Sequence, residues 1–179
     1  MNTSHIINGL LLIMLCSCGK DSIETYKVPK QPASLRGTPE ITTKTPKIGF
    51  EADLPETWQV IQGSGMRVVS YNIDGTEIDF YAIKLGMGDL VSNVNRWRSQ
   101  IGLEEHTLEE ISEYVIPLMA SGAPVNFVEL YNSELDKGIL AAIVDTKPTY
   151  WYFTAKGSIK ELRANSSDIQ RFINSIRFN

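Results

Sequence analysis

The chain has 179 residues, with 17 Lys and Arg against 21 Asp and Glu, so its formal net charge is −4. That mild acidity argues against nucleic-acid binding, which requires a basic face. Both cysteines precede residue 19, so the rest of the chain can form no internal disulfide, no thiolate nucleophile and no cysteine-based metal site.

The N-terminus carries an apolar run of thirteen residues that ends at Cys18. A transmembrane helix needs roughly 20 residues, whereas a short run that closes on small residues is typical of an export signal. Leu15 and Ser17 precede Cys18 as in a bacterial lipobox, while bulky Leu15 directly precedes Cys16. We therefore expect residues 1–17 to be a lipoprotein signal peptide and Cys18 to be lipidated. An ordinary secretory signal or a buried apolar strand is the alternative.

If Cys18 is lipidated, its acyl chains hold the protein to the membrane. Each buried methylene of an acyl chain contributes roughly 0.8 kcal/mol, so several chains hold a protein for a long time. The next residue is Gly19, not the Asp that is associated with inner-membrane retention in enteric bacteria. In a cell with two membranes we expect the periplasmic side of the outer membrane rather than the inner membrane.

Residues 18–46 are predicted to be a flexible tether that starts at the lipidated cysteine. They hold four of the eight prolines and few large apolar residues, so they cannot bury enough apolar surface to become ordered. Residues 47–179 have the length of a single domain with one core.

The first part of this domain is expected to contain three strands and a helix. Apolar alternation predicts strands over residues 47–54, 66–73 and 77–85, and Asp74-Gly75 is a strong hairpin signal. Asp89 is expected to cap a helix that reaches Gln100 and ends before Gly102. The residues with helical spacing for its buried stripe are Leu90, Val94, Trp97 and Ile101.

The second part is expected to begin with another helix. Residues 107–110 have the form of a capping box, and the helix is predicted to reach Ala120 with a kink at Pro117. Strands are predicted over residues 125–131, 138–145 and 149–156, and a final amphipathic helix is predicted over residues 167–176.

The last predicted strand is rich in aromatic residues. Alternation places Trp151 and Phe153 in the core, with Tyr150 and Tyr152 facing outward. An exposed pair of tyrosines could form a recognition surface, and ordinary sheet packing is the alternative.

The order of these elements predicts an α+β domain, in which helices pack on an antiparallel sheet, rather than a doubly wound parallel sheet. Three segments resemble PsbP/Mog1-like (DcrB-like) domains: residues 54–58 (LPETW), 150–154 (YWYFT) and 172–176 (FINSI). Residues 93–98 followed by Gly102-Leu103 also look like a feature of uncharacterised bacterial lipoproteins of this type. The resemblance implies an α/β/α sandwich that acts as a binding or assembly module, and it brings no shared catalytic residue.

One donor-rich segment directly follows the glycine loop at residues 86–88. We single out Asn93, Arg96 and Arg98 as a possible binding site for an anionic or carbonyl ligand, because an arginine offers a planar fork of donors. The alternative is structural: either arginine ties the helix to a strand carboxylate, such as Asp79 or Glu77.

Patterns for catalysis are weak in the domain. Its one histidine, His106, lies in a predicted loop and is expected to be solvated, and there is no Gly-x-Ser-x-Gly elbow. The glycine loops at residues 63–66 and 86–88 complete no phosphate-binding motif. We expect no metal and no cofactor, although carboxylates are plentiful enough for a hydrolytic pair.

These features predict a non-catalytic, lipid-anchored protein of the cell envelope that binds an envelope protein partner or a small ligand. An envelope hydrolase that acts through carboxylates is the first alternative. A structural spacer with no dedicated ligand is the second alternative.

Overall fold

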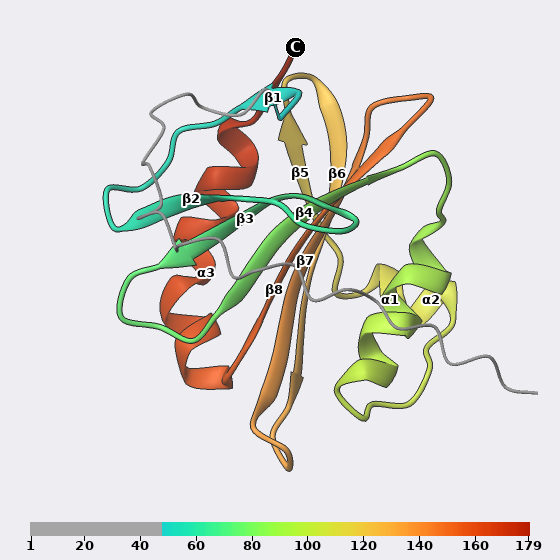
Figure 1. Ribbon diagram of the computed structural model, residues 1–179. Helices are drawn as coiled ribbons and strands as arrows, with labels where there is room; N and C mark the ends of the chain where they lie inside the picture. Colours follow the sequence, from blue (N-terminus) through green and yellow to red (C-terminus); the bar gives the residue numbers. More distant parts are fainter. Residues whose placement is uncertain (1–47) are drawn as a thin grey trace, which may run out of the picture. The chain divides into compact units, whose positions relative to one another are not determined.

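The computed structural model describes residues 48–179 (Figure 1). The predicted signal peptide, the lipidation site at Cys18 and the tether lie outside these residues. Within them, no helix is long and apolar enough to cross a membrane.

Seven strands form one antiparallel sheet. They are β2 (Trp58–Gln62), β3 (Arg67–Ile73), β4 (Asp79–Leu85), β5 (Ile116–Ala120), β6 (Ala123–Asn132), β7 (Lys137–Asp145) and β8 (Tyr150–Gly157). Their order across the sheet is β2-β3-β4-β8-β7-β6-β5. A separate antiparallel pair joins β1 (Phe50–Glu51) to β9 (Arg177–Phe178), so the two ends of the domain meet.

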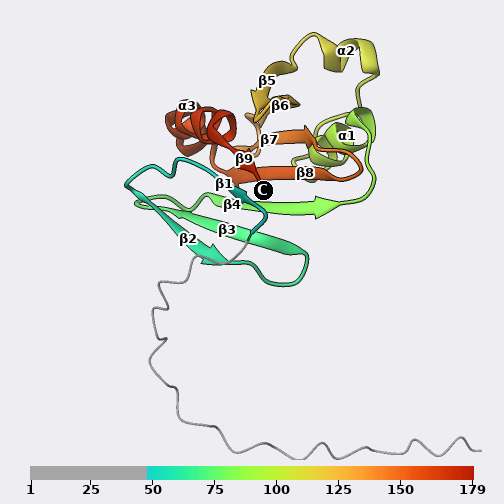
Figure 2. The ribbon, with the colours of Figure 1, turned by 90° about the horizontal axis from the view of Figure 1, so that it is seen from above.

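Three helices cover the two faces of the sheet. Figure 2 shows α3 (Ile159–Ser175) on one face, with α1 (Leu90–Gln100) and α2 (Leu108–Ser112) on the other. Each face has its own core of buried side chains. The predicted α+β class, with helices packed on an antiparallel sheet, is therefore confirmed.

Coverage on both faces explains one wrong prediction in β8. Tyr152 was expected to face outward, but its side chain is completely buried among the residues beneath α1. A central strand between two layers of helices buries both sets of alternating side chains. Alternate side chains of β8 therefore enter the two cores in turn, so alternation along this strand does not distinguish core from solvent.

Several local predictions are confirmed. Asp74-Gly75 lies in the turn between β3 and β4, which pair as a hairpin. The Asp89 carboxylate accepts a hydrogen bond from the Ser92 N–H at 2.9 Å and caps α1. Gly102 follows α1 with a φ of +76°, a conformation that glycine adopts without a Cβ clash. Thr107 and Glu110 form the expected capping box.

The predicted helix across Pro117 is wrong. The capped helix α2 ends at Ser112, and Pro117 lies in β5, the edge strand that pairs only with β6. Proline lacks the N–H that a central strand would have to donate, but an edge strand tolerates it. At Ser121 and Gly122 the φ angles are both positive, as in the tight turns that join hairpins.

Two further elements differ from the prediction. The helix α3 begins at Ile159, eight residues before the predicted start, and Ser158 caps it by accepting a hydrogen bond from the Glu161 N–H. Ser158 and Glu161 have the spacing of a capping box, so the sequence contained this signal. The strand β2 was not predicted, and β1 is much shorter than the predicted strand over residues 47–54.

Candidate functional site

The structure joins Asn93 and Arg96 but separates Arg98 from them. Asn93 is buried beneath α1, where its side-chain N–H donates to the Asp89 carbonyl at 2.7 Å. Its side-chain oxygen accepts a hydrogen bond from Arg96 at 2.7 Å. Arg98 is also buried, and its Nε donates to the Glu104 carbonyl. Arg98 therefore fastens the loop after α1, and the donor patch is reduced to Asn93 and Arg96.

Neither of the two strand carboxylates considered for these arginines contacts them. Asp79 of β4 accepts two hydrogen bonds of 2.7 Å from Arg67 of β3, whose register partner is Ile83. The Glu77 carboxylate forms no ion pair within residues 48–179, and the Glu77 backbone N–H donates to the Glu161 carboxylate of α3. The fork that binds a strand carboxylate therefore belongs to Arg67, which the sequence analysis did not single out.

The glycine loop at residues 86–88 and His106 both have packing roles. A Cβ atom on Gly88 would lie 1.7 Å from the Tyr152 hydroxyl, which itself donates to the Met87 carbonyl. His106 was expected to be solvated, but its Nδ1 is buried without a hydrogen-bond partner among residues 48–179. Its ring packs edge-on against Tyr114. No group of three or more potential ligands in this part of the chain could hold a metal ion.

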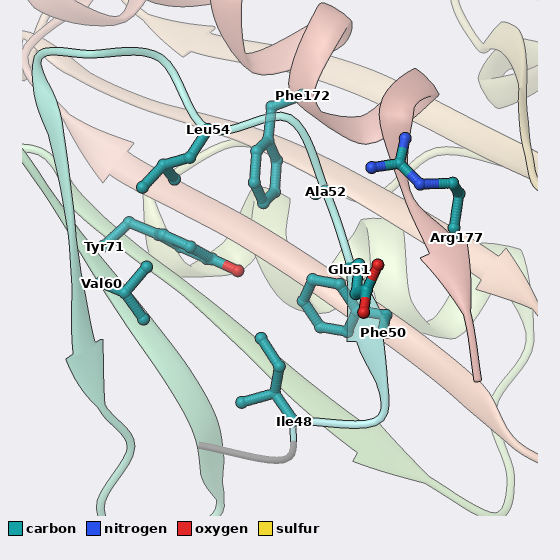
Figure 3. Close-up of a pocket in the computed structure, with 9 residues that line it drawn as sticks. All are labelled: Ile48, Phe50, Glu51, Ala52, Leu54, Val60, Tyr71, Phe172 and Arg177. Atoms are coloured by element: carbon teal, nitrogen blue, oxygen red, sulfur yellow. The ribbon is translucent and has the colours of Figure 1, made fainter. Parts of the chain in front are cut away.

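An apolar cavity of about 380 Å³ lies on the α3 face, at the edge of the sheet near β2 (Figure 3). The segment that includes β1 forms one wall, and β2, β3 and α3 form the others. The lining residues are Ile48, Phe50, Glu51, Ala52, Leu54, Val60, Tyr71, Phe172 and Arg177. Most of these side chains are apolar, so the cavity suits an apolar ligand body.

Tyr71 of β3 supplies the polar group inside the cavity. Its side chain is only 4% exposed and packs at 4.9 Å, between ring centroids, from Phe172. Figure 3 shows its hydroxyl directed toward Phe172 and Phe50. The hydroxyl has no protein hydrogen-bond partner within residues 48–179, and burial raises the pKa of the phenol above its ordinary value. Tyr71 shares the buried face of β3 with Val69 and Ile73, and alternation along the strand gave no sign of a cavity.

Two charged residues lie at the cavity wall, facing each other across the β1–β9 pair. Glu51 and Arg177 are register partners. The Arg177 guanidinium donates to the Asp53 carboxylate at 2.8 Å and to the Ser175 carbonyl, and the bond to Asp53 raises the pKa of Arg177. Glu51 forms no ion pair with any residue that the structure describes. The site thus combines an apolar interior, one free hydroxyl and a charged wall.

Comparison with known proteins finds similar solved structures but no matching sequence family. No protein-family model and no curated protein sequence matches the chain. Among solved structures, PsbP from the cyanobacterium Synechocystis sp. PCC 6803 aligns with 75% of this chain and 89% of its own, at 12% identity and a TM-score of 0.48. LpqN of Mycobacterium tuberculosis, involved in cell envelope biogenesis, aligns with 73% of this chain and 83% of its own, at 9% identity and a TM-score of 0.45. PsbP, to which the sequence showed a resemblance, is therefore among the similar structures.

We predict that Tyr71 makes the protein less stable in alkali. Above about pH 10 the unfolded chain loses the phenolic proton while the folded chain keeps it, so the free energy of unfolding falls as the pH rises. One proton changes this free energy by about 1.4 kcal/mol per pH unit.

Chemical unfolding of the wild type and of Tyr71→Phe at pH 9, 10 and 11 measures the effect. The wild type should lose about 1 kcal/mol more than the variant between pH 9 and pH 11. The other buried tyrosines are common to both proteins and cancel in this difference. Parallel pH dependences in the two proteins would contradict the burial of this hydroxyl.

Proposed function

We propose that this protein is a lipid-anchored, non-catalytic binding module of the cell envelope, which takes up a small, mainly apolar ligand with one polar group. The lipobox that ends at Cys18 supports the anchor and its envelope location. The observation that carries the binding function is the free Tyr71 hydroxyl inside the apolar cavity.

Tyr71 brings a single hydroxyl to the wall of a mainly apolar cavity. The Tyr71 hydroxyl faces an open cavity and is not among the fully buried polar atoms without a partner. A ligand that offers a carbonyl or hydroxyl to Tyr71 adds one hydrogen bond, which contributes about 0.5–1.5 kcal/mol, and its apolar body gains free energy by leaving water. The cavity of about 380 Å³ falls within the size range of ordinary ligand sites.

The carboxylates near the cavity favour binding over hydrolysis. Glycoside hydrolysis uses two carboxyl groups on either side of the scissile bond. Among residues 48–179, Glu51 is the one carboxylate that lines the cavity, and nearby Asp53 accepts a hydrogen bond from Arg177. With a single carboxylate at the wall, the geometry suits recognition of a ligand better than cleavage of one.

Binding of prodan, a naphthalene that carries one ketone, tests this site by fluorescence. The mature chain from residue 18, with Cys18→Ser, can be made without lipid and studied without detergent. Prodan should bind saturably, and Tyr71→Phe should weaken binding roughly three- to tenfold, because it removes one hydrogen bond. Val60→Trp, which places a large side chain in the cavity wall, should weaken binding further.

Tyr81→Phe is the matched control, since Tyr81 lies on the opposite face of the sheet from Tyr71. This variant should bind prodan like the wild type. Equal losses in Tyr71→Phe and Tyr81→Phe, or unchanged binding in Val60→Trp, would contradict the proposed site.

We also predict that Cys18, and not Cys16, carries the lipid. When the full chain with its signal peptide is produced in a bacterium with radiolabelled palmitate, the wild type and Cys16→Ala should be labelled, whereas Cys18→Ala should not. Labelling of Cys18→Ala would contradict the predicted anchor and leave the binding site to be judged on the prodan experiment.

A further inference from the structure

A second hollow, which we call the Arg96 groove, lies on the other face of the sheet. Its volume is about 330 Å³, and it lies between α1 and the hairpin that joins β2 to β3. The residues that matter here are Ser64 and Arg67 of the hairpin region, Tyr81 and Thr154 of the sheet, and Arg96 and Gln100 of α1. The fold thus brings Arg96 next to a glycine loop, at residues 63–66, that is distant in sequence.

Positive charge in the Arg96 groove stands out against an acidic domain. Residues 48–179 contain 11 Lys and Arg against 18 Asp and Glu, a formal charge of −7. Arg96 lines the groove and is held by the neutral Asn93 amide. Lys156 does not line the groove, but its ammonium group lies beside two lining residues: it donates to the neutral Gln100 amide at 2.8 Å and lies 5.7 Å from the centroid of the Tyr81 ring. Neither cation forms an ion pair among residues 48–179. Both charges are therefore available to an anion.

The remaining cation of the groove is already neutralised and forms part of its wall. Arg67 binds Asp79 with both ends of its fork. The guanidinium also lies 4.0 Å from the centroid of the Tyr81 ring. This pair fixes the Tyr81 ring beside the groove and leaves Arg96 as the cation of the lining that can bind a ligand.

Hydroxyl groups complete the set of donors. Thr154 is only 2% exposed, yet it lines the groove and offers a hydroxyl there. Ser64 lines the groove from the hairpin side. Donors on the hairpin, the sheet and α1 surround the hollow from several directions. A tetrahedral oxyanion, whose acceptors point in several directions, matches this arrangement better than a planar carboxylate does.

We propose that the Arg96 groove binds a phosphate group, with Arg96 as its principal partner and Tyr81 and Met66 packing against the body that carries the phosphate. Met66 lines the groove and is 72% exposed, so its side chain is free to cover a ligand. The phosphate can belong to a soluble phosphate ester or to the headgroup of a phospholipid, because both present the same acceptors.

Two probes separate these sources, with the same mature Cys18→Ser chain used for both. Phenyl phosphate is titrated and followed by the NMR shifts of the Arg96 side-chain Nε–H. Vesicles of phosphatidylglycerol, compared with vesicles of phosphatidylcholine, are tested by co-sedimentation. We expect saturable binding of phenyl phosphate if the ligand is soluble, or retention by the anionic vesicles if it is a lipid.

Variants assign the binding to the groove. Arg96→Gln should weaken binding roughly tenfold or more, because it removes a charge-assisted contact, and Lys156→Gln should weaken it less. Arg163→Gln is the matched control, because Arg163 is exposed on α3 and lies over Tyr131 instead. Tyr71→Phe should leave phosphate binding unchanged, so this result is independent of the apolar cavity.

Binding of either probe that is lost in Arg96→Gln and kept in Arg163→Gln supports the proposal. Failure of both probes to bind, or equal losses in Arg96→Gln and Arg163→Gln, would overturn it. Arg96 is exposed but donates to the buried Asn93 side chain, so Arg96→Gln is expected to lower the unfolding midpoint slightly. Binding is therefore compared well below that midpoint, so that misfolding is not mistaken for loss of a site.

Discussion

The Phe172 side chain of α3 is the contact on which both the sandwich and its cavity depend. Its ring centroid lies between 4.9 and 6.2 Å from those of four aromatic residues on four different strands, Trp58, Tyr71, Phe80 and Phe153. Such contacts combine buried apolar area with favourable ring geometry. They fix α3 against the half of the sheet that runs from β2 to β8. Because Phe172 also lines the apolar cavity, the packing that holds the helix shapes the site as well.

Two polar atoms in this aromatic cluster lack protein partners, and their surroundings differ. The Trp58 indole nitrogen is completely enclosed among residues 48–179 and stays without a partner. The Tyr71 hydroxyl instead faces a cavity of about 380 Å³. An enclosed orphan donor only destabilises the fold, whereas an orphan hydroxyl in a cavity can be satisfied on binding. This difference makes Tyr71, rather than Trp58, the centre of the proposed function.

Local signals in the sequence predicted much of the fold. The hairpin at Asp74-Gly75 and the cap at Asp89 depend on neighbouring residues, and both are confirmed. The strand that contains Pro117 was missed because a proline is tolerated in an edge strand but not in a central one. Which strand lies at the edge is known only from the complete topology of the sheet. For the same reason, Tyr152 could not be recognised as buried before the positions of the helices were known.

The sites were less predictable than the fold. The sequence indicated Asn93 and Arg96 but not their partners, since Ser64 and Thr154 reach the same groove from distant parts of the chain. No sequence pattern predicted the apolar cavity. Its wall joins β1 to α3, and no local sequence pattern shows that a hydroxyl between them lacks a partner.

The measurement that tests the central claim most directly is a crystal structure of the mature chain with prodan bound. The account predicts the ketone oxygen at about 2.5–3.0 Å from the Tyr71 hydroxyl, with the naphthalene against Phe172; prodan bound elsewhere, with the cavity empty, would contradict it.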